Sequence, residues 1–366
     1  KLTRVLVNEL AKDRSEFVSA ALISDDASAV IESDEVDIVV ELIGGEEPAL
    51  GYICSALRAG KHVVTANKKV MAKHGPEVVS LAAANGVTLA FEASVGGGIP
   101  IIGPLVHDLA ANDITAVNAV INGTTNYMLT RMAGESLGYE EALSVAQSLG
   151  YAEPDPTDDV DGLDAAYKLA ILSSIAFRGD IRDSDVFREG IRYLSPVDFK
   201  YAHELGYVVK LLATSSSIGG EVRARVHPAF LPEHNPLSKV DGVYNAVELE
   251  GDLISWAMFQ GPGAGSQPTA SAILGDVAAI AQRIASGIPA ATLPPLTKEL
   301  TVLPMADLET KYYLRVRAFD RPGVMAKITS VLGEKQVSLA SVIQKEVGEG
   351  DAAAEIVITT HKAKEH

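Results

Sequence analysis

The sequence has 366 residues, a formal net charge of −17 and an isoelectric point near 4.9. This length predicts two or three domains, and no basic patch offsets the acidity, which argues against nucleic acid or an anionic membrane as a partner. No apolar run reaches the roughly 18 residues of a membrane span. The single cysteine, Cys54, cannot form an internal disulfide, so we expect a cytoplasmic protein.

The first hundred residues alternate strand-like and helical segments. Continuous apolar runs predict buried strands at 5–7, 37–43, 62–65 and 88–93. The segments between them have helical spacing and end at glycines, as helices at 48–59 and 69–85 should. This alternation predicts a parallel, doubly wound α/β sheet, in which ligands bind beyond the carboxyl ends of the strands.

A glycine-rich phosphate turn is missing from the start of this sheet. A dinucleotide-binding sheet of the Rossmann type usually opens with a strand and a Gly-x-Gly-x-x-Gly turn, and none precedes Val5. The triplet at 96–98 has the wrong spacing and runs into Ile99 and Pro100. We therefore expect the first strand, the turn and the first helix, about 30 residues, to precede Lys1. The incomplete nucleotide-binding domain is expected to span 1–100.

The middle of the chain predicts an inserted α+β domain over 101–262. A period of two indicates a half-buried strand at 114–121, and the residues from 183 to 255 suggest an antiparallel sheet. Helical patterns occupy 100–111 and 140–149. The segment Asn122 to Tyr127 is rich in turn-forming and polar residues, so it is a helix cap, a functional loop or both.

An acidic stretch at 150–168 brings five aspartates and one glutamate close to Lys168. Pro154 and Pro156 disfavour a helix, which we expect to begin near Asp161 and to continue beyond Lys168. Asp164 lies four residues before Lys168 and so shares its helix face. The pair is either an ordinary solvated ion pair or a functional lysine surrounded by carboxylates.

The last third predicts a returning helix, a linker and a small domain. A glycine turn at 261–265 leads into a helix at 264–285, which is either an anion site or a packing element that completes the first domain. The proline-rich segment 288–308 is expected to be a linker. The C-terminal domain, 311–366, has a βαββ pattern that we expect to lack its final strand. Its expected elements are strands at 312–319, 337–346 and 352–360, a helix at 324–335 and the start of another at 362–366.

Six sequence motifs resemble those of homoserine dehydrogenase of the long form, which has a C-terminal ACT domain. The resemblance implies that this chain is truncated at both ends. The motifs are DIVVELIGG (37–45), GKHVVTANK (60–68), FEASVGGGIPII (91–102), NGTTNY (122–127), the acidic stretch 150–168 and GAGSQPTASA (263–272). The resemblance implies an NAD(P)-dependent oxidoreductase that interconverts L-homoserine and L-aspartate 4-semialdehyde. It also implies a place in threonine, methionine and isoleucine biosynthesis, with feedback inhibition by threonine through the ACT domain.

The same resemblance assigns roles to particular residues. Lys168 and Lys68 would be the catalytic lysines, with Lys168 as proton donor and acceptor and Lys68 on the substrate carboxylate or the cofactor ribose. The expected substrate-binding residues are Glu153, Asp164, Asp159 and Thr124. The expected cofactor-binding residues are Ile43, Gly44, Thr65, Lys68, Ser94 and Gly265.

The cofactor would be NADP or NAD, with a lean towards NAD because Asn8 stands where a basic residue often binds the 2′-phosphate. A monovalent cation, Na⁺ or K⁺, would be held by the backbone carbonyls of Glu92, Val95, Gly97 and Ile99. Asp320 and Gly323 would belong to an effector site for threonine. ACT domains commonly pair, so we expect a homo-oligomer, a dimer or a tetramer.

Two alternatives compete with this interpretation. In the first, the protein is an amino-acid sensor with a degenerate catalytic part, but Lys68, Glu153, Asp164 and Lys168 are all present. In the second, the oxidoreductase acts on another amino-acid or sugar aldehyde. Substrate competition would separate this second alternative from a homoserine dehydrogenase.

Overall fold

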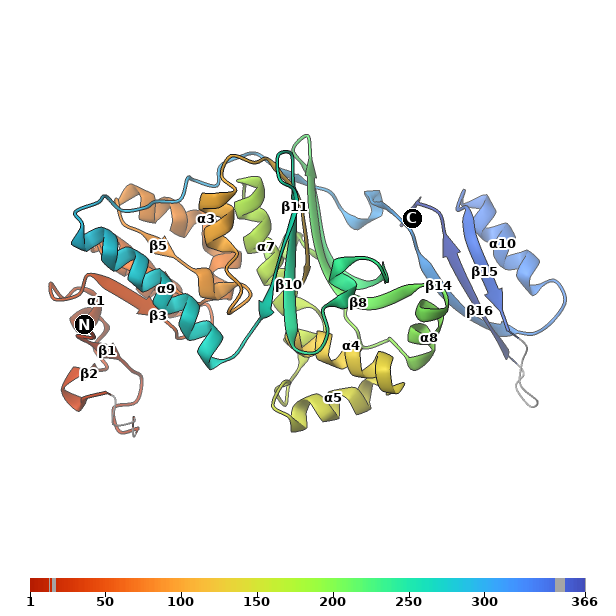
Figure 1. Cartoon of the computed structure of the whole chain (residues 1–366), viewed down its shortest axis with the longest axis horizontal. Helices are drawn as coiled ribbons and strands as arrows, with labels where there is room; N and C mark the ends of the chain where they lie inside the picture. The colour runs from red at the N-terminus through yellow and green to blue at the C-terminus, as the bar shows by residue number, and fades with distance from the viewer. Residues whose placement is uncertain (13, 15–17, 346–352, 366) are drawn as a thin grey trace.

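The computed structural model describes residues 1–12, 14, 18–345 and 353–365. The molecule is elongated, with a parallel sheet at one end, a large sheet in the middle and a small sheet at the other end (Figure 1). Among the described residues, no helix is both long and apolar enough to cross a bilayer. The three parts follow the order that the sequence predicts.

The first part is a three-stranded parallel sheet in the order β3-β4-β5. Its elements are β3 (Ile38–Glu41), β4 (His62–Thr65), β5 (Leu89–Ala90), α2 (Ala49–Arg58) and α3 (Lys68–Ala84). The predicted strand at 5–7 forms as β1 (Val5–Leu6), but it pairs with β2 (Ile23–Ser24) in a separate sheet. The strand β2, the 3₁₀ turn Ala20–Leu22 before it and α1 (Ala27–Ile31) were not predicted.

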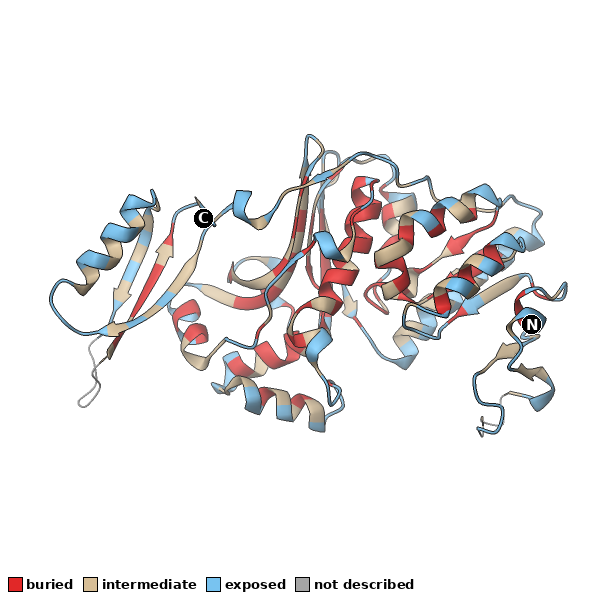
Figure 2. Ribbon diagram, turned by 180° about the vertical axis from the view of Figure 1, so that it is seen from behind, coloured by how far each residue is buried: buried red, intermediate tan, exposed pale blue. Residues whose placement is uncertain are grey.

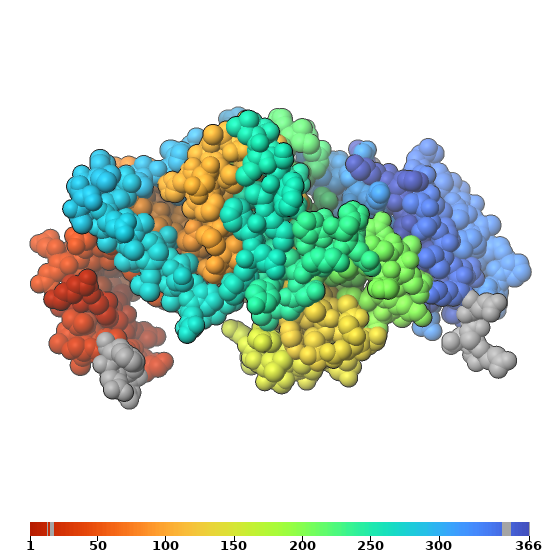
Figure 3. All heavy atoms as spheres, in the orientation of Figure 1, coloured from red at the N-terminus to blue at the C-terminus, as the bar shows by residue number. Residues whose placement is uncertain are grey.

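A helix from far along the chain returns to this first part. The helix α9 (Ser266–Ala285) contacts β4 and the 3₁₀ turn Glu92–Ser94. Figures 1 and 3 show it lying across the same end of the molecule as β3 and α3. The loop ends of the parallel sheet therefore face a segment that follows the middle domain in sequence.

The central sheet has the order β11-β10-β6-β8-β9-β12, with β7 beside β9. Its strands are β6 (Ile114–Val120), β7 (Phe187–Arg188), β8 (Tyr207–Ile218), β9 (Glu221–Pro232), β10 (Tyr244–Gly251), β11 (Ser255–Pro262) and β12 (Thr301–Val302). All neighbours are antiparallel except β7 and β12, which pair with β9 in parallel. The strand β12 comes from the proline-rich segment 288–308, so this segment adds a short edge strand to the sheet.

Five α-helices accompany the central sheet: α4 (Gly123–Glu135), α5 (Tyr139–Ser148), α6 (Thr157–Val160), α7 (Leu163–Phe177) and α8 (Pro196–Glu204). Short helical turns lie at Pro104–Asp108, Asp183–Asp185, Pro236–Lys239 and Met305–Asp307. The helix expected to begin near Asp161 is confirmed as α7, which starts at Leu163. The short helix α6 was not predicted, and Pro156 is the residue before its first turn. Proline is tolerated at the start of a helix, where a backbone N–H has no intrahelical partner.

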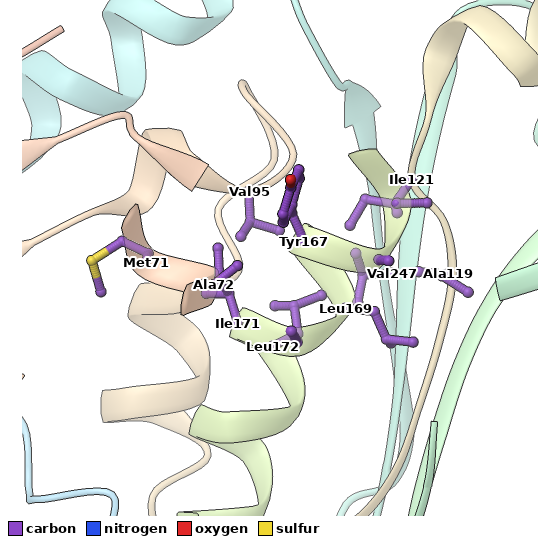
Figure 4. Close-up of a cluster of buried hydrophobic side chains, with 14 of the residues drawn as sticks. Met71, Ala72, Val95, Ala119, Ile121, Tyr167, Leu169, Ile171, Leu172 and Val247 are labelled. Atoms are coloured by element: carbon purple, nitrogen blue, oxygen red, sulfur yellow. The ribbon is translucent and has the colours of Figure 1, made fainter. Parts of the chain in front are cut away.

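The helix α7 is the most deeply buried helix of the middle part. All of its residues except Leu163 and Lys168 are buried, as expected for a helix that is apolar nearly all round. Figure 2 shows this burial, and Figure 4 shows Ala72 of α3 on one side of α7 and Val247 of β10 on the other. Packing on both sides fixes the position of the first turns of α7, which carry Asp164 and Lys168.

The C-terminal part is an antiparallel sheet in the order β14-β16-β15 with one helix. Its elements are β14 (Tyr313–Phe319), α10 (Val324–Glu334), β15 (Leu339–Gln344) and β16 (Ala353–Thr360). The βαββ prediction is confirmed, although its strand limits at 346 and 352 lie outside the described residues.

The prediction of a helix at 362–366 is wrong for the residues of this segment that the structure describes. Residues 363 and 364 form β17 (Ala363–Lys364), which pairs with β13 (Glu309–Thr310) in antiparallel fashion. Alanine and lysine favour a helix, but a neighbouring strand overrides such a weak local preference. His366 lies outside the described residues.

Candidate active site

Two lysines from different domains share one buried carboxylate. Lys68 is the first residue of α3, which Asn67 caps by accepting the Val70 N–H at 3.1 Å. Asp164 and Lys168 lie on the first turns of α7, and the Lys168 Nζ donates to Asp164 Oδ2 at 2.7 Å. The Lys68 Nζ donates to the other oxygen, Oδ1. The structure thus brings together both lysines and one of the acids that the sequence singled out.

Asn122 connects this cluster to a second acid. Its Nδ2 donates to Asp159 Oδ1 at 2.7 Å and to Asp164 Oδ2 at 2.9 Å. Its Oδ1 accepts the Thr125 N–H at 2.8 Å and so caps α4. Both interpretations of the segment 122–127 therefore apply, because one side chain is a helix cap and a partner of two carboxylates.

Lys168 is held at two points. Besides Asp164, its ammonium donates to the carbonyl oxygen of Ile121 at 3.0 Å, at the end of β6. An ammonium has three donors, so one N–H remains after these two hydrogen bonds. The Lys168 side chain is 12% exposed, so it is largely but not fully buried.

Opposing effects set the charges of this cluster. Burial alone would raise the pKa of the Asp164 carboxyl, but Lys168 and Lys68 hold it well below its ordinary value. Burial would lower the pKa of Lys68, yet the charge and hydrogen bond of Asp164 outweigh it, so this pKa is raised. Burial raises the pKa of Asp159, which Asn122 only partly opposes. The cluster therefore holds an ionised Asp164 beside a protonated Lys68.

The carboxyl ends of β3 and β4 are tied together by Glu41, which the sequence analysis missed. Its carboxylate is 4% exposed and accepts the Thr65 hydroxyl at 2.6 Å, the Ile43 N–H at 2.7 Å and the Gly44 N–H at 3.3 Å. Thus three of the predicted cofactor-binding residues meet at one side chain. The signal that could have found it is a single charge inside an apolar strand.

The loop after β5 is held from two directions. The Glu92 carboxylate accepts the N–H groups of Ile101, Ile102 and Gly103 at 2.6 to 2.9 Å. Asp276 of α9 accepts the Glu92 N–H at 3.0 Å, and burial, with the nearby Glu92 charge, raises the pKa of Asp276 to about 6. These contacts fix the segment that contains Ser94, which is buried and donates to the Phe91 carbonyl at 2.7 Å.

Glycines let the turn before α9 approach this loop. A Cβ on Gly97 would lie 2.6 Å from the Gly263 carbonyl oxygen, and one on Gly263 would lie 2.2 Å from Asn245 Cγ. Side chains at these positions would push the two backbones apart. Gly265 precedes the first turn of α9 with a φ of +117°, so this predicted cofactor-binding residue lies at a helix N-terminus beside the loop.

The predicted cation ligands remain a prediction. Among the described residues, no group of three or more His, Cys, Asp and Glu side chains could hold a metal ion. The predicted ligands are instead backbone carbonyls of one irregular loop, and that of Glu92 accepts the Val95 N–H at 3.4 Å. The other three ligands follow within the same loop.

Two predicted substrate-binding residues make no hydrogen bond to the lysine cluster among the described residues. Glu153 is exposed on the loop 150–156. The Thr124 hydroxyl donates to the Tyr151 carbonyl at 2.6 Å and so holds this loop.

The predicted effector residues lie in the C-terminal part. The Gln344 Nε2 donates to Asp320 Oδ1 at 3.2 Å, and Gly323 precedes α10 with a φ of +88°. They are therefore separate from the lysine cluster.

Comparisons with known proteins identify the family. The family model described as homoserine dehydrogenase matches residues 100–278, that of its NAD-binding domain matches 1–92, and the ACT domain model matches 312–366. A homoserine dehydrogenase of Synechocystis is 44% identical over 98% of this chain and 84% of its own length. The chain belongs to the homoserine dehydrogenase family. One of Bacillus subtilis is 40% identical over the whole chain and 84% of its own length.

A solved homoserine dehydrogenase has the same fold. The structure from Thiobacillus denitrificans has a TM-score of 0.88 at 42% identity, over 94% of this chain and 79% of that one. A hyperthermophilic archaeal homoserine dehydrogenase in complex with NADPH has a TM-score of 0.62 at 32% identity, over 70% and 75% of the two chains. The chain therefore belongs to a family of oxidoreductases and has NAD(P)-binding, catalytic and ACT domains.

Proposed function

We propose that Lys168, Lys68 and Asp164 form the reacting centre for the NAD(P)-dependent interconversion of L-homoserine and L-aspartate 4-semialdehyde. The observation that carries this proposal is the carboxylate of Asp164, which is shared by two ammonium groups at the junction of the first two domains. Such a centre can stabilise and protonate an alkoxide. The resemblance assigns this step to threonine, methionine and isoleucine biosynthesis.

Lys168 is the proposed proton donor and acceptor. When the aldehyde is reduced, the ammonium of Lys168 gives a proton to the developing alkoxide, and in the reverse direction the amine takes the proton from the hydroxyl. A bound nicotinamide cofactor supplies or accepts the hydride. Asp164 stays ionised and, with the Ile121 carbonyl, orients the Lys168 Nζ.

The substrate also carries an α-ammonium and a carboxylate, which need partners of opposite charge. We assign Glu153 and Asp164, with Asp159 as a further member, to the ammonium side. Thr124 supports this side because its hydroxyl holds the loop of Glu153. Lys68 serves the carboxylate side or the cofactor ribose.

The ends of the parallel strands fit a nicotinamide dinucleotide. A Cβ on Gly44 would meet nothing within 4 Å, so there is room for a ligand against the backbone of Ile43 and Gly44. Thr65, Ser94 and Gly265 line the proposed path. Asn8 brings no positive charge for a 2′-phosphate, which supports NAD, whereas the archaeal homoserine dehydrogenase is in complex with NADPH. We therefore propose that the enzyme uses NAD or NADP.

A monovalent cation, Na⁺ or K⁺, is proposed at the carbonyls of Glu92, Val95, Gly97 and Ile99. Backbone oxygens of an irregular loop suit a hard cation. The tight packing of Gly97 on Gly263 and the hydrogen bond of Asp276 to the Glu92 N–H restrain this loop. The restraint supports a preformed site.

Regulation by threonine through Asp320 and Gly323 is proposed from the ACT domain. The strands β14 and β15 are the edges of its sheet, so a second copy could pair there in a dimer or tetramer. The lone Cys54 fits a reducing cytoplasm as the site of action.

The test is homoserine-dependent reduction of NAD and of NADP by the full-length gene product, beside its Lys168→Ala variant. Turnover in the wild type that is lost in the variant supports the reaction, the substrate and the key residue together. A folded wild type that is silent with both cofactors but binds threonine would favour the sensor alternative.

A substrate without the α-ammonium tests the choice of substrate. With 4-hydroxybutyrate in place of homoserine, the rate should fall to a small fraction, because the carboxylates of Glu153 and Asp164 lose their partner. An equal rate with both compounds would favour another aldehyde or alcohol as the natural substrate.

A further inference from the structure

The loop 150–156 has few backbone hydrogen bonds of its own. Pro154 and Pro156 have no N–H to donate, so the loop must be held by groups outside it. The side chain of Gln147, on the last turn of α5, donates through Nε2 to the Glu153 carbonyl at 3.0 Å and to the Pro154 carbonyl at 3.3 Å. One amide therefore holds the backbone of the residue that carries a proposed substrate carboxylate.

Other contacts hold the first half of the loop. The N–H groups of Tyr151 and Ala152 both donate to the Ala146 carbonyl, at 2.9 and 3.3 Å. The Thr124 hydroxyl donates to the Tyr151 carbonyl, and the Tyr127 and Tyr151 ring centroids are 4.9 Å apart. Among the hydrogen bonds of the described residues, those from Gln147 are the ones that reach 153 and 154.

We propose that Gln147 is a positioning residue that sets the place of the Glu153 carboxylate for the α-ammonium of the substrate. This inference rests on the proposed function of Glu153. Gln147 itself lies on α5 and makes no hydrogen bond to Lys68, Asp164 or Lys168 among the described residues. A neutral amide suits the position, because it offers two N–H donors to carbonyl oxygens and adds no charge beside Glu153.

Two substitutions separate this role from simple stability. Gln147→Glu keeps the shape but faces the two carbonyls with oxygens, and Gln147→Ala removes the donor without adding charge. Either should raise the KM for homoserine by about 10-fold or more, since small misplacements of substrate-binding groups are costly. The KM for NAD(P) should stay within about twofold, because α5 is outside the proposed cofactor path.

Ser148→Ala is the matched control. The Ser148 hydroxyl donates to the Val145 carbonyl at 2.8 Å, within α5 itself, so this variant should keep the wild-type KM. A purely structural role of Gln147 would lower the melting temperature and the active fraction without moving the KM for homoserine. An unchanged KM in both folded Gln147 variants overturns the inference.

Hydrogen–deuterium exchange gives a measurement that does not depend on activity. Amides of 150–153 should exchange faster in Gln147→Ala than in the wild type and in Ser148→Ala, while α4 exchanges at the same rate. Unchanged exchange in the loop also overturns the inference. A wild type without homoserine turnover overturns the proposed function instead, and exchange then decides alone whether Gln147 orders the loop.

Discussion

At the residue scale, Lys168 has the geometry of a proton donor with fixed orientation. Its Nζ is bonded to Asp164 and to the Ile121 carbonyl. Lys168→Ala should lower kcat at least about 100-fold while the fold persists, as expected when a general acid is removed. Lys168→Arg should fail as well, because arginine hardly gives up its proton. Steady-state homoserine oxidation measures both variants.

The control for this prediction is Lys239→Ala, because Lys239 is an exposed lysine of the same part of the chain. It should keep the wild-type kcat. Turnover near that of the wild type in Lys168→Ala would remove Lys168 from the mechanism.

Asp164 separates two ammonium groups that would otherwise repel each other. Asp164→Asn keeps the size but removes the charge, so it should cost on the order of 3 kcal/mol in the free energy of unfolding at pH 7. The pKa of Asp164 is lowered in the folded chain. Its stabilisation is therefore complete above about pH 4, the pKa of an unfolded aspartate, and is lost as the pH falls below that value.

Urea unfolding of wild type and Asp164→Asn at pH 7 and at pH 3 checks this prediction. The difference between the two proteins should narrow at the lower pH, because Asp164 begins to be protonated in the unfolded chain. A difference of equal size at both values would mean that its charge does not stabilise the fold.

At the element scale, Glu41 joins the ends of β3 and β4. Glu41→Ala would leave the Thr65 hydroxyl and two N–H groups without their acceptor. Because hydrogen bonds to charged groups contribute about 1.5–3 kcal/mol, loss of loop order should raise the KM for the cofactor about 10-fold. The kcat at saturating cofactor should change little.

Glu35→Ala serves as the control for Glu41→Ala, because Glu35 is exposed and bonds Arg4 in the same part of the chain. Steady-state kinetics with the cofactor as the varied substrate measures both. An unchanged KM in Glu41→Ala would show that the strand ends do not depend on this link.

Most helices and strands could be predicted from the local hydrophobic pattern of the sequence. The apolar run at 62–65 forms β4, and the spacing of Asp164 and Lys168 places them on one face of α7, in contact. Periodicity and spacing act within a few residues, and the structure preserves them. The prediction of a helix at 362–366 was wrong because β17 pairs with β13, a contact across more than 50 residues of chain that local pattern does not reveal.

The long-range contacts that assemble the candidate active site could not be predicted from local sequence pattern. Lys68 meets Asp164 across 96 residues of sequence, and Asn122 meets Asp159 across 37. No local pattern encodes such meetings, so resemblance to a family supplied the grouping of the lysines. Glu41 belongs to a matching motif of that family, yet its role emerges only when both strand ends are seen together.

At the scale of the whole molecule, Asp198 of α8 joins the catalytic part to the ACT domain. It is 4% exposed and accepts the Tyr313 hydroxyl at 2.9 Å and the Arg315 Nε at 2.7 Å, both from β14. It also accepts the Ser195 N–H at 2.8 Å, which starts α8. Since α8 contacts α4, and α4 begins beside Asn122, a shift of β14 could reach the lysine cluster.

This connection predicts how threonine would act. Arg315→Met removes the charged partner of Asp198 but leaves the start of α8 intact. The substitution should weaken inhibition by threonine several-fold, because a coupling free energy between two sites is commonly about 1–3 kcal/mol. The kcat and KM measured without threonine should stay unchanged. Inhibition curves with increasing threonine measure the effect.

Arg317→Met is the matched control for this coupling. Arg317 lies two residues further along β14, so its side chain is on the same face of the strand as Arg315, and it is exposed. It should be inhibited like the wild type. Equal inhibition of Arg315→Met and Arg317→Met would mean that the effect of threonine does not pass through Asp198. A wild type insensitive to threonine would contradict the proposed regulation itself, because the Asp198 contact would then join the domains without transmitting an effector signal.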